Sequence, residues 1–183
     1  MIQGERVQIR PLRQADAEIL SVWWNIPETM AHAGFPSGLM RSVDSIEEEV
    51  AEECRKKTYA DQRRMMICEG KRPIGEISYS HWDQRNRSVE FGIKIAREAD
   101  RGRGLGTEAL RLWLSYLFAY LAVDRIYLST MPGNEAAQRL YCNLGFQEYG
   151  RARKAYFDAR SNLFVDVILM DLLREEWTEY GIL

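Results

Sequence analysis

The stretch Arg101-Gly-Arg-Gly-Leu-Gly-Thr-Glu-Ala-Leu110 places three glycines in a short loop that runs directly into an apolar helical pattern. Glycines at this density let the backbone approach a ligand closely and adopt φ angles that other residues avoid. The first N–H groups of the following helix have no intrahelical partner, and that end of the helix carries a partial positive charge. The stretch therefore predicts an anion site, above all for phosphate groups.

Two common phosphate-binding motifs do not fit this loop. The Walker pattern Gly-x4-Gly-Lys-Ser/Thr is absent, and the glycines read Gly102-x-Gly104-x-Gly106 rather than Gly-x-Gly-x-x-Gly. The loop also lies in the middle of the chain, after an expected antiparallel hairpin, and not after the first strand of a βαβ unit. Dinucleotide binding is therefore disfavoured, and a turn that only caps the helix stays open as an alternative.

The composition indicates an ordinary globular domain. The chain has 183 residues, 46% of them apolar and 28% charged, with a net charge of −2. This length fits one domain, residues 1–183. The near-neutral charge suggests neither a nucleic-acid nor a membrane partner, and the longest apolar run, 110–123, is too short to span a bilayer.

The cysteine and histidine content argues against a metal site. The three cysteines form no CxxC pair, and the two histidines complete no zinc pattern. We interpret the cysteines as reduced thiols and expect a cytoplasmic location.

Alternating and helical patterns predict a mixed α and β chain. Pro27, Gly34, Pro36 and Gly38 indicate a loop, and Ser45 with Glu48 forms a capping-box pattern at the start of a helix. In the strand 89–95, residues Val89, Phe91, Ile93 and Ile95 are expected on one face. The expected strands are 7–12, 64–68, 74–82, 89–95, 125–130, 147–155 and 164–170, and the expected helices are 15–24, one from 45, one through 110–121 and a short one from 134.

A second group of residues lies on the short helix. Asn134, Ala137 and Tyr141 are spaced i, i+3, i+7, which places them on one helix face. Asn134 is the natural N-cap, and Gly145 is suited to end the helix. Taken alone, these residues are explained by a structural role in which Asn134 caps the helix and Tyr141 packs against its neighbours.

Together, the two groups resemble a known family. Arg101-x-x-Gly104-x-Gly106 is similar to the pyrophosphate loop of the GNAT (Gcn5-related) N-acetyltransferases, and Asn134-x-x-Ala137-x-x-x-Tyr141-x-x-x-Gly145-Phe146 resembles that family's second conserved segment. The resemblance runs from Arg10-Pro11-Leu12 to Glu175-Glu176-Trp177 and looks most like the branch of bacterial ribosomal-protein alanine and spermidine acetyltransferases. It implies an α+β (mixed α/β) fold: a central, mostly antiparallel sheet with a splayed parallel strand pair and about four helices.

The resemblance also implies a ligand and its contacts. Acetyl-CoA would be the acetyl donor, with its pyrophosphate held by backbone N–H groups of the glycine loop and its pantetheine arm against the splayed strand. Metal chemistry is not implied. The expected cofactor-binding residues are Ile93, Ile95, Arg101, Arg103, Gly104, Gly106, Thr107 and Asn134.

The implied reaction is direct acetyl transfer to a primary amine in a ternary complex. The amine must lose a proton before it attacks, and Glu90 is the candidate carboxylate because Val-Glu-Phe-Gly resembles the family's Ala-Glu-Ile-Gly segment. Glu76 and His81 are weaker candidates. Tyr141 would protonate the departing CoA thiolate, whereas Cys142 has no base that can be placed beside it for covalent catalysis.

The acceptor stays open at this stage. A protein N-terminus, a polyamine and an aminoglycoside all fit, and the acidic run Glu47–Glu53 suits either a polycation or solvent. A non-catalytic acyl-CoA sensor or interaction module is the alternative outside the enzymes. The strand 164–170 could complete its own sheet or help to form a homodimer.

Overall fold

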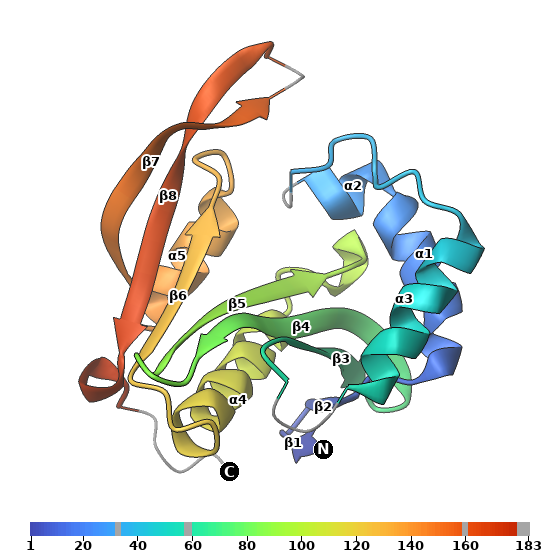
Figure 1. Ribbon diagram of the computed structural model, residues 1–183, viewed down its shortest axis with the longest axis horizontal. Helices are drawn as coiled ribbons and strands as arrows, with labels where there is room; N and C mark the ends of the chain where they lie inside the picture. Colours follow the sequence, from blue (N-terminus) through green and yellow to red (C-terminus); the bar gives the residue numbers. More distant parts are fainter. Residues whose placement is uncertain (32–33, 57–59, 159–160, 179–183) are drawn as a thin grey trace.

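The computed structural model describes residues 1–31, 34–56, 60–158 and 161–178, and its strands form one sheet (Figure 1). Neighbouring strands are antiparallel except for the parallel pair β5–β6, which confirms the expected sheet. Strand β8 pairs with both β6 and β7, so it completes this chain's own sheet. In sheet order the strands are β1 (Ile2–Gln3), β2 (Val7–Pro11), β3 (Arg63–Glu69), β4 (Arg72–Asp83), β5 (Ser88–Ile95), β6 (Arg125–Thr130), β8 (Leu163–Leu173) and β7 (Gln147–Asp158).

The described residues contain five α-helices, against the four or so that we expected: α1 (Ala17–Asn25), α2 (Pro27–Met30), α3 (Val43–Arg55), α4 (Leu105–Ala119) and α5 (Glu135–Asn143). Short 3-10 helices cover Gln14–Asp16, Glu98–Asp100 and Arg174–Glu176. None of the helices in the described part of the chain is long and apolar enough to cross a membrane.

Two expectations about helix starts were wrong. The expected loop at residues 27–38 begins with α2, because Pro27 occupies a first-turn position where no backbone N–H is needed. Helix α3 begins two residues before Ser45. Its N-cap is Ser42, whose hydroxyl accepts a hydrogen bond from the Ser45 N–H at 3.2 Å.

The two faces of the sheet carry different helices. Ile67 and Ile77 are buried in the core built around α4, whereas Met66 and Cys68 are buried with α1 and α3. Because successive side chains of a strand point to opposite faces, α4 covers one face and α1–α3 cover the other near β2–β4. We call these the α4 face and the α1 face. Figure 1 shows α1–α3 at one end of the molecule and α5 beside β6 and β8 at the other.

Strand β5 follows this alternation. Val89 and Phe91 are buried in the α4-face core, and Ile93 and Ile95 pack against it, as the sequence predicts. The intervening residues Glu90, Gly92 and Lys94 therefore lie on the α1 face.

The N-terminus of α4 is tied to the beginning of β2. Glu108 accepts hydrogen bonds at one carboxylate oxygen from the N–H groups of Arg6 and Val7, at 2.8 and 3.1 Å. The Arg6 guanidinium donates to the other oxygen at 3.0 Å and to the Arg103 carbonyl at 2.9 Å. Burial alone would raise the pKa of Glu108, but these hydrogen bonds outweigh it and hold the pKa below its ordinary value.

We expect Glu108→Ala to destabilise the protein by about 1–3 kcal/mol, because two backbone N–H groups lose their acceptor. A lowered folded-state pKa means that the Glu108 carboxylate stabilises the protein above its unfolded-state pKa of about 4.3 and loses this contribution as the pH falls through the folded-state value. Urea unfolding at neutral and acidic pH measures both effects. Glu135→Ala is the matched control, since Glu135 is exposed and forms an exposed ion pair with Arg139. Equal losses for the two variants would contradict the anchoring role.

Candidate active site

Strands β5 and β6 lie side by side only at their beginnings. Their register pairs Ser88 with Arg125, Val89 with Ile126 and Glu90 with Tyr127. Beyond these pairs β5 continues to Ile95 beside β4, and β6 continues to Thr130 beside β8. The two central strands therefore diverge, as Figure 1 shows. This is the splayed parallel pair that the resemblance implied.

The glycine loop joins β5 to α4. Gly102 and Gly104 have φ angles of +69° and +79°, a region costly for residues with a Cβ, and Gly104 is the N-cap residue of α4. A Cβ on Gly106 would lie 3.3 Å from the Ile95 side chain, so this glycine lets α4 approach the end of β5. The N–H groups of the first helical turn have no intrahelical acceptor. Loop and helix thus present the donors that an anion site needs.

The two loop arginines have different surroundings. Arg101 donates to the carbonyl oxygens of Ile95 and Ala96 at 3.0 and 3.1 Å, so its guanidinium secures the end of β5. The Arg103 guanidinium instead forms ion pairs with Glu69 at 2.7 Å and Asp100 at 3.1 Å. Its side chain is therefore occupied by Glu69 and Asp100, and its backbone carbonyl accepts from Arg6.

Asp100 anchors the glycine loop to strand β4. It is buried and receives two hydrogen bonds from the Arg72 guanidinium, at 2.8 and 2.9 Å. These bonds, together with the charges of Arg72 and Arg103, lower the pKa of the Asp100 carboxyl despite its burial. The loop is therefore attached to β4 by a charged pair that is intact at neutral pH.

Helix α5 brings Asn134 and Tyr141 toward the loop. The Asn134 side chain caps the helix by accepting from the Ala137 N–H at 3.4 Å, and Gly145 adopts φ +95° just beyond the helix end. Both expectations are confirmed. Tyr141 packs edge-on against Phe91 with ring centroids 5.8 Å apart. Burial raises the pKa of Tyr141 to about 12, so its hydroxyl is protonated at neutral pH.

A groove of about 470 Å³ opens between the end of β5, the glycine loop and α5. It brings together most of the residues that the sequence singled out: Ile93, Ile95, Arg101, Gly104, Gly106, Thr107, Asn134 and Tyr141. Arg103 and Glu90 do not line it. The sequence did not single out Thr29 or Lys94, which also line the groove. Thr29 belongs to the unexpected helix α2, and Lys94 lies between two residues that we did predict.

Glu90 lies on the α1 face, does not line the groove, and is paired with His81. The His81 Nδ1 donates to a Glu90 carboxylate oxygen at 3.0 Å. The β4–β5 register shifts between Ser80 and Asp83, and His81 itself has φ +51°. Irregularities of this kind turn a side chain out of its regular direction. The bulge therefore brings the candidate residues Glu90 and His81 into contact on the α1 face.

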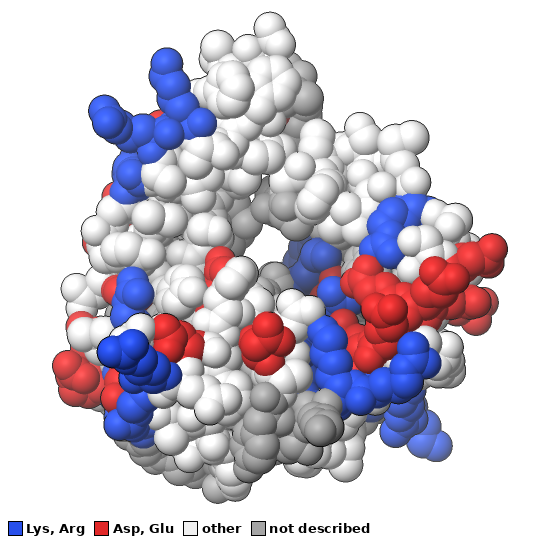
Figure 2. Space-filling view, viewed as in Figure 1, with Lys and Arg blue, Asp and Glu red and all other residues white. Residues whose placement is uncertain are grey.

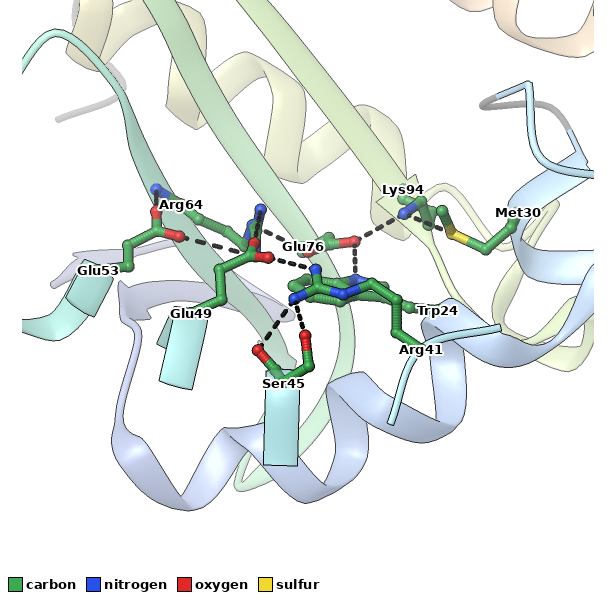
Figure 3. A network of polar contacts seen from close by, with 9 residues as sticks. All are labelled: Trp24, Met30, Arg41, Ser45, Glu49, Glu53, Arg64, Glu76 and Lys94. Carbon is green, nitrogen blue, oxygen red and sulfur yellow. Dashed lines mark hydrogen bonds and ion pairs between the residues drawn. The ribbon is translucent and has the colours of Figure 1, made fainter. Parts of the chain in front are cut away.

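Glu76, the other carboxylate candidate, belongs to a buried polar network (Figure 3). One of its oxygens accepts from the Trp24 indole N–H at 2.9 Å and from the Lys94 ammonium at 2.8 Å. Arg64 lies 3.4 Å from its other oxygen. Burial would raise the pKa of Glu76, but the charges of Lys94 and Arg64 outweigh it and lower that pKa. Glu76 is therefore a buried anion with established partners.

The network continues into α3. Glu49 forms ion pairs with Arg41 and with Arg64, and Glu53 pairs with Arg64 at 3.6 Å. Figure 3 shows these carboxylates pointing from α3 toward the arginines. The acidic residues of α3 that face the sheet are thus already matched by cations. In Figure 2, a patch of acidic side chains lies over the α3 end of the molecule and basic side chains border it.

The space-filling view shows an opening in the middle of this same side of the molecule (Figure 2). Comparison with Figure 1 places it beside β5, between α2 and the β6 side of the sheet. The hairpin β7–β8 closes over part of this region, because the Tyr156 hydroxyl donates to the Gly34 carbonyl at 3.1 Å.

Comparison with known proteins identifies the arrangement. Residues 6–147 match the model of the acetyltransferase (GNAT) domain. The chain is 30% identical over 182 residues to YdaF of Bacillus subtilis, to which a ribosomal N-acetyltransferase activity is provisionally assigned, with 95% of this chain and 94% of YdaF covered. It is 31% identical over 98 residues to the spermidine N(1)-acetyltransferase of Escherichia coli, which covers 54% of this chain and 52% of that protein.

The fold is also similar to solved structures. Spermidine N-acetyltransferase of Vibrio cholerae, in complex with CoA and spermine, superposes with a TM-score of 0.84 at 24% identity, covering 94% of this chain and 98% of that one. The chain belongs to the GNAT family of N-acetyltransferases, which transfer an acetyl group from acetyl-CoA to an amine.

Proposed function

We propose that this protein acetylates the N-terminal amine of a peptide or protein, by direct transfer through the opening between β5 and β6. The observation that carries the proposal is the short pairing of these strands, which ends at Glu90 and Tyr127. The groove, lined from β5 by Ile93 and Ile95 of the α4 face and also by Lys94, and the Glu90–His81 pair on the α1 face can then act on the two sides of one reacting centre. Donor and acceptor would approach from opposite faces.

The groove is suited to acetyl-CoA along its whole length. The N–H groups of Arg103, Gly104, Gly106 and Thr107 would hold the pyrophosphate at the start of α4. Beyond Glu90, the edge of β5 that faces β6 has no strand partner. The N–H and C=O groups of this edge around Ile93 and Ile95 can pair with the amides of the pantetheine arm, as a further strand would, except for the Ile95 carbonyl, which accepts from Arg101.

Other side chains of the groove would complete the donor site. The amide N–H₂ of Asn134 remains available to the arm, because the helix cap uses only its oxygen. Arg101 would act indirectly by holding the end of β5 in position. A backbone N–H near Ile93 would polarise the thioester carbonyl as charge develops on its oxygen.

The α1 face would receive the amine and its proton. An ammonium group must lose a proton before its nitrogen can attack the thioester carbon. Glu90 belongs to the last pair of the β5–β6 register, and the Glu90–His81 pair can accept this proton through a water molecule. The new N–C bond then forms as the C–S bond breaks, and no covalent enzyme intermediate is required.

Tyr141 would assist the leaving thiolate. Its hydroxyl keeps its proton, because burial raises its pKa to about 12. A thiol has a pKa of about 8.5, so complete proton transfer from Tyr141 to the thiolate is uphill. Donation of a hydrogen bond to the developing negative charge on sulfur is therefore the role that its chemistry supports best.

The charge pattern favours a single amine over a polyamine. The carboxylates that face the sheet, Glu49, Glu53 and Glu76, are matched by Arg41, Arg64 and Lys94. The several positive charges of spermidine would have to pair instead with exposed acidic residues of α3 such as Glu52. In sequence, the similarity to the spermidine acetyltransferase of Escherichia coli covers 54% of this chain and the similarity to YdaF covers 95%, whereas the Vibrio cholerae spermidine enzyme shares the fold over 94% of this chain. The matched carboxylates and the longer sequence similarity to YdaF support a peptide N-terminus as the acceptor.

An amine panel tests this proposal. Short peptides with free N-termini, spermidine and an aminoglycoside are offered with acetyl-CoA, and release of free thiol is measured. We expect turnover to be highest with a peptide and to disappear when its N-terminus is blocked. A higher kcat/KM for spermidine than for any peptide would contradict the proposed acceptor. Binding of CoA without turnover on any amine would favour a sensor.

We expect Tyr141→Phe to lower kcat by about 10- to 100-fold, since a hydrogen bond to a charged group contributes about 1.5–3 kcal/mol. The affinity for CoA should change little, because the aromatic ring remains. Single-turnover acetyl transfer measures the chemical step, and Tyr120→Phe, at the exposed residue that follows α4, is the control. An unchanged single-turnover rate would exclude a role for the hydroxyl.

We expect Glu90→Gln to lower kcat/KM for the amine by about 100-fold, the usual scale of general base catalysis. The amide keeps the shape of the side chain and its contact with His81 but cannot accept a proton. The pH profile of kcat/KM is the deciding measurement, with Glu47→Gln on the exposed side of α3 as the control. A profile identical to that of the unchanged protein would rule out proton transfer to Glu90.

A further inference from the structure

Gly92 is the one residue of β5 that is exposed, although β5 is a central strand of the sheet. It lies on the α1 face, between Glu90 and Lys94, and directly opposite Ser78 of β4. One face of an antiparallel sheet can face water, but on this face the neighbouring residues Glu90 and Lys94 of β5 are half-buried. At Gly92 the backbone is uncovered on the face from which the amine would arrive.

Strand β6 shows the same feature at the matching position. Ser129 is its single exposed residue. Gly92 and Ser129 each stand two residues beyond the last pair in the register, Glu90 and Tyr127. Because this spacing returns to the same face of each strand, both residues face the α1 side. The two sides of the opening between the strands are thus bordered by small residues at the same level.

The backbone conformation does not require a glycine at position 92. Its φ is not in the left-handed region, unlike those of Gly102 and Gly104. A glycine within a strand is normally unfavourable, and it commonly marks a site where a ligand approaches the backbone closely. A Cβ at this position would meet a single near neighbour, the Ser78 hydroxyl at 3.3 Å. This contact is tight, so alanine fits if the Ser78 hydroxyl moves by a few tenths of an ångström.

A cavity lies next to this point on the same face. It measures about 270 Å³ and is lined by Ser78 and Ser80, which are opposite Gly92 and Glu90 in the register, and by residues of α3. An acceptor that fills this cavity can extend past Gly92 to the edge of β5. Its amine then reaches the side of Ile93, where the thioester carbonyl would bind.

We propose that Gly92 determines which amines can reach the thioester, because it leaves the backbone of β5 uncovered where the acceptor passes through the opening between β5 and β6. We call this point the crossing. Ser129 borders the same crossing from β6. This inference rests on the proposed direction of acceptor approach. Side chains at position 92 would narrow the crossing in proportion to their size and leave the donor groove unchanged, because Gly92 does not line that groove.

The test compares Gly92→Ala and Gly92→Val with the unchanged protein on an amine that the unchanged protein acetylates. We expect kcat/KM for the amine to fall in the order Gly, Ala, Val, by about tenfold or more for valine, since small displacements of reacting groups have effects of this scale. The Kd for CoA should stay the same. Gly150→Ala is the matched control in β7, where a Cβ would have no neighbour within 4 Å.

Two further variants distinguish a blocked path for the acceptor from a steric clash between the new Cβ and its neighbours. Gly92→Ala combined with Ser78→Ala removes the only close neighbour of the new Cβ, and we expect the loss of kcat/KM to persist. Ser129→Leu should reproduce the loss from the other strand. Recovery in the double variant, or a parallel loss of CoA binding and thermal stability, would show that Gly92 has only a packing role and would overturn the inference.

The outcome is distinguishable from failure of the proposed acceptor. If peptides are not substrates, the same variants are measured on whichever amine the unchanged protein acetylates. The graded loss with side-chain size then still supports the crossing, and equal activity of all the variants contradicts it.

Discussion

The hydrogen bonding between β5 and β6 stops after Glu90, although both strands continue, and the active site depends on this limit. A sheet whose two central strands stayed paired would separate the α4 face from the α1 face completely. Here the pairing is replaced by an opening with free backbone groups along β5. The glycine loop and α5 stand on one side of it, and the Glu90–His81 pair stands on the other. One interruption of the sheet thus supplies a place for the donor arm and a route for the acceptor.

Charged contacts around the opening hold its borders in place. Glu108 ties the start of α4 to β2, Asp100 ties the glycine loop to Arg72, and Arg101 holds the carbonyl end of β5. The contacts of Glu76 with Lys94 and Trp24 join helix α1 to the part of β5 that no longer pairs with β6. Because β5 lacks a neighbour on one side there, these contacts take over the positioning that a paired strand would provide.

Local patterns in the sequence predicted the parts of the site that use backbone chemistry. The glycine spacing, the Asn134 cap and the alternation of Val89 to Ile95 each follow from short-range rules, and the structure has all three. The resemblance added the splayed pair. What could not be predicted depends on contacts between distant segments. The ion pairs of Arg103 with Glu69, the closure of Tyr156 on Gly34, and the approach of Thr29 to the groove link residues far apart in sequence. Helix α2 was missed because proline and glycine signals in one short segment favour a loop.

The central claim is that donor and acceptor meet through the sheet from opposite faces. A crystal structure with a bisubstrate conjugate, in which an acetyl linker joins the CoA sulfur to a peptide N-terminus, tests it most directly. The account predicts that the CoA portion lies in the groove between β5 and α5, that the linker passes between β5 and β6 beside Gly92, and that the peptide lies on the α1 face near Glu90. A conjugate with both portions on the α4 face, and no atom between the two strands, would contradict it.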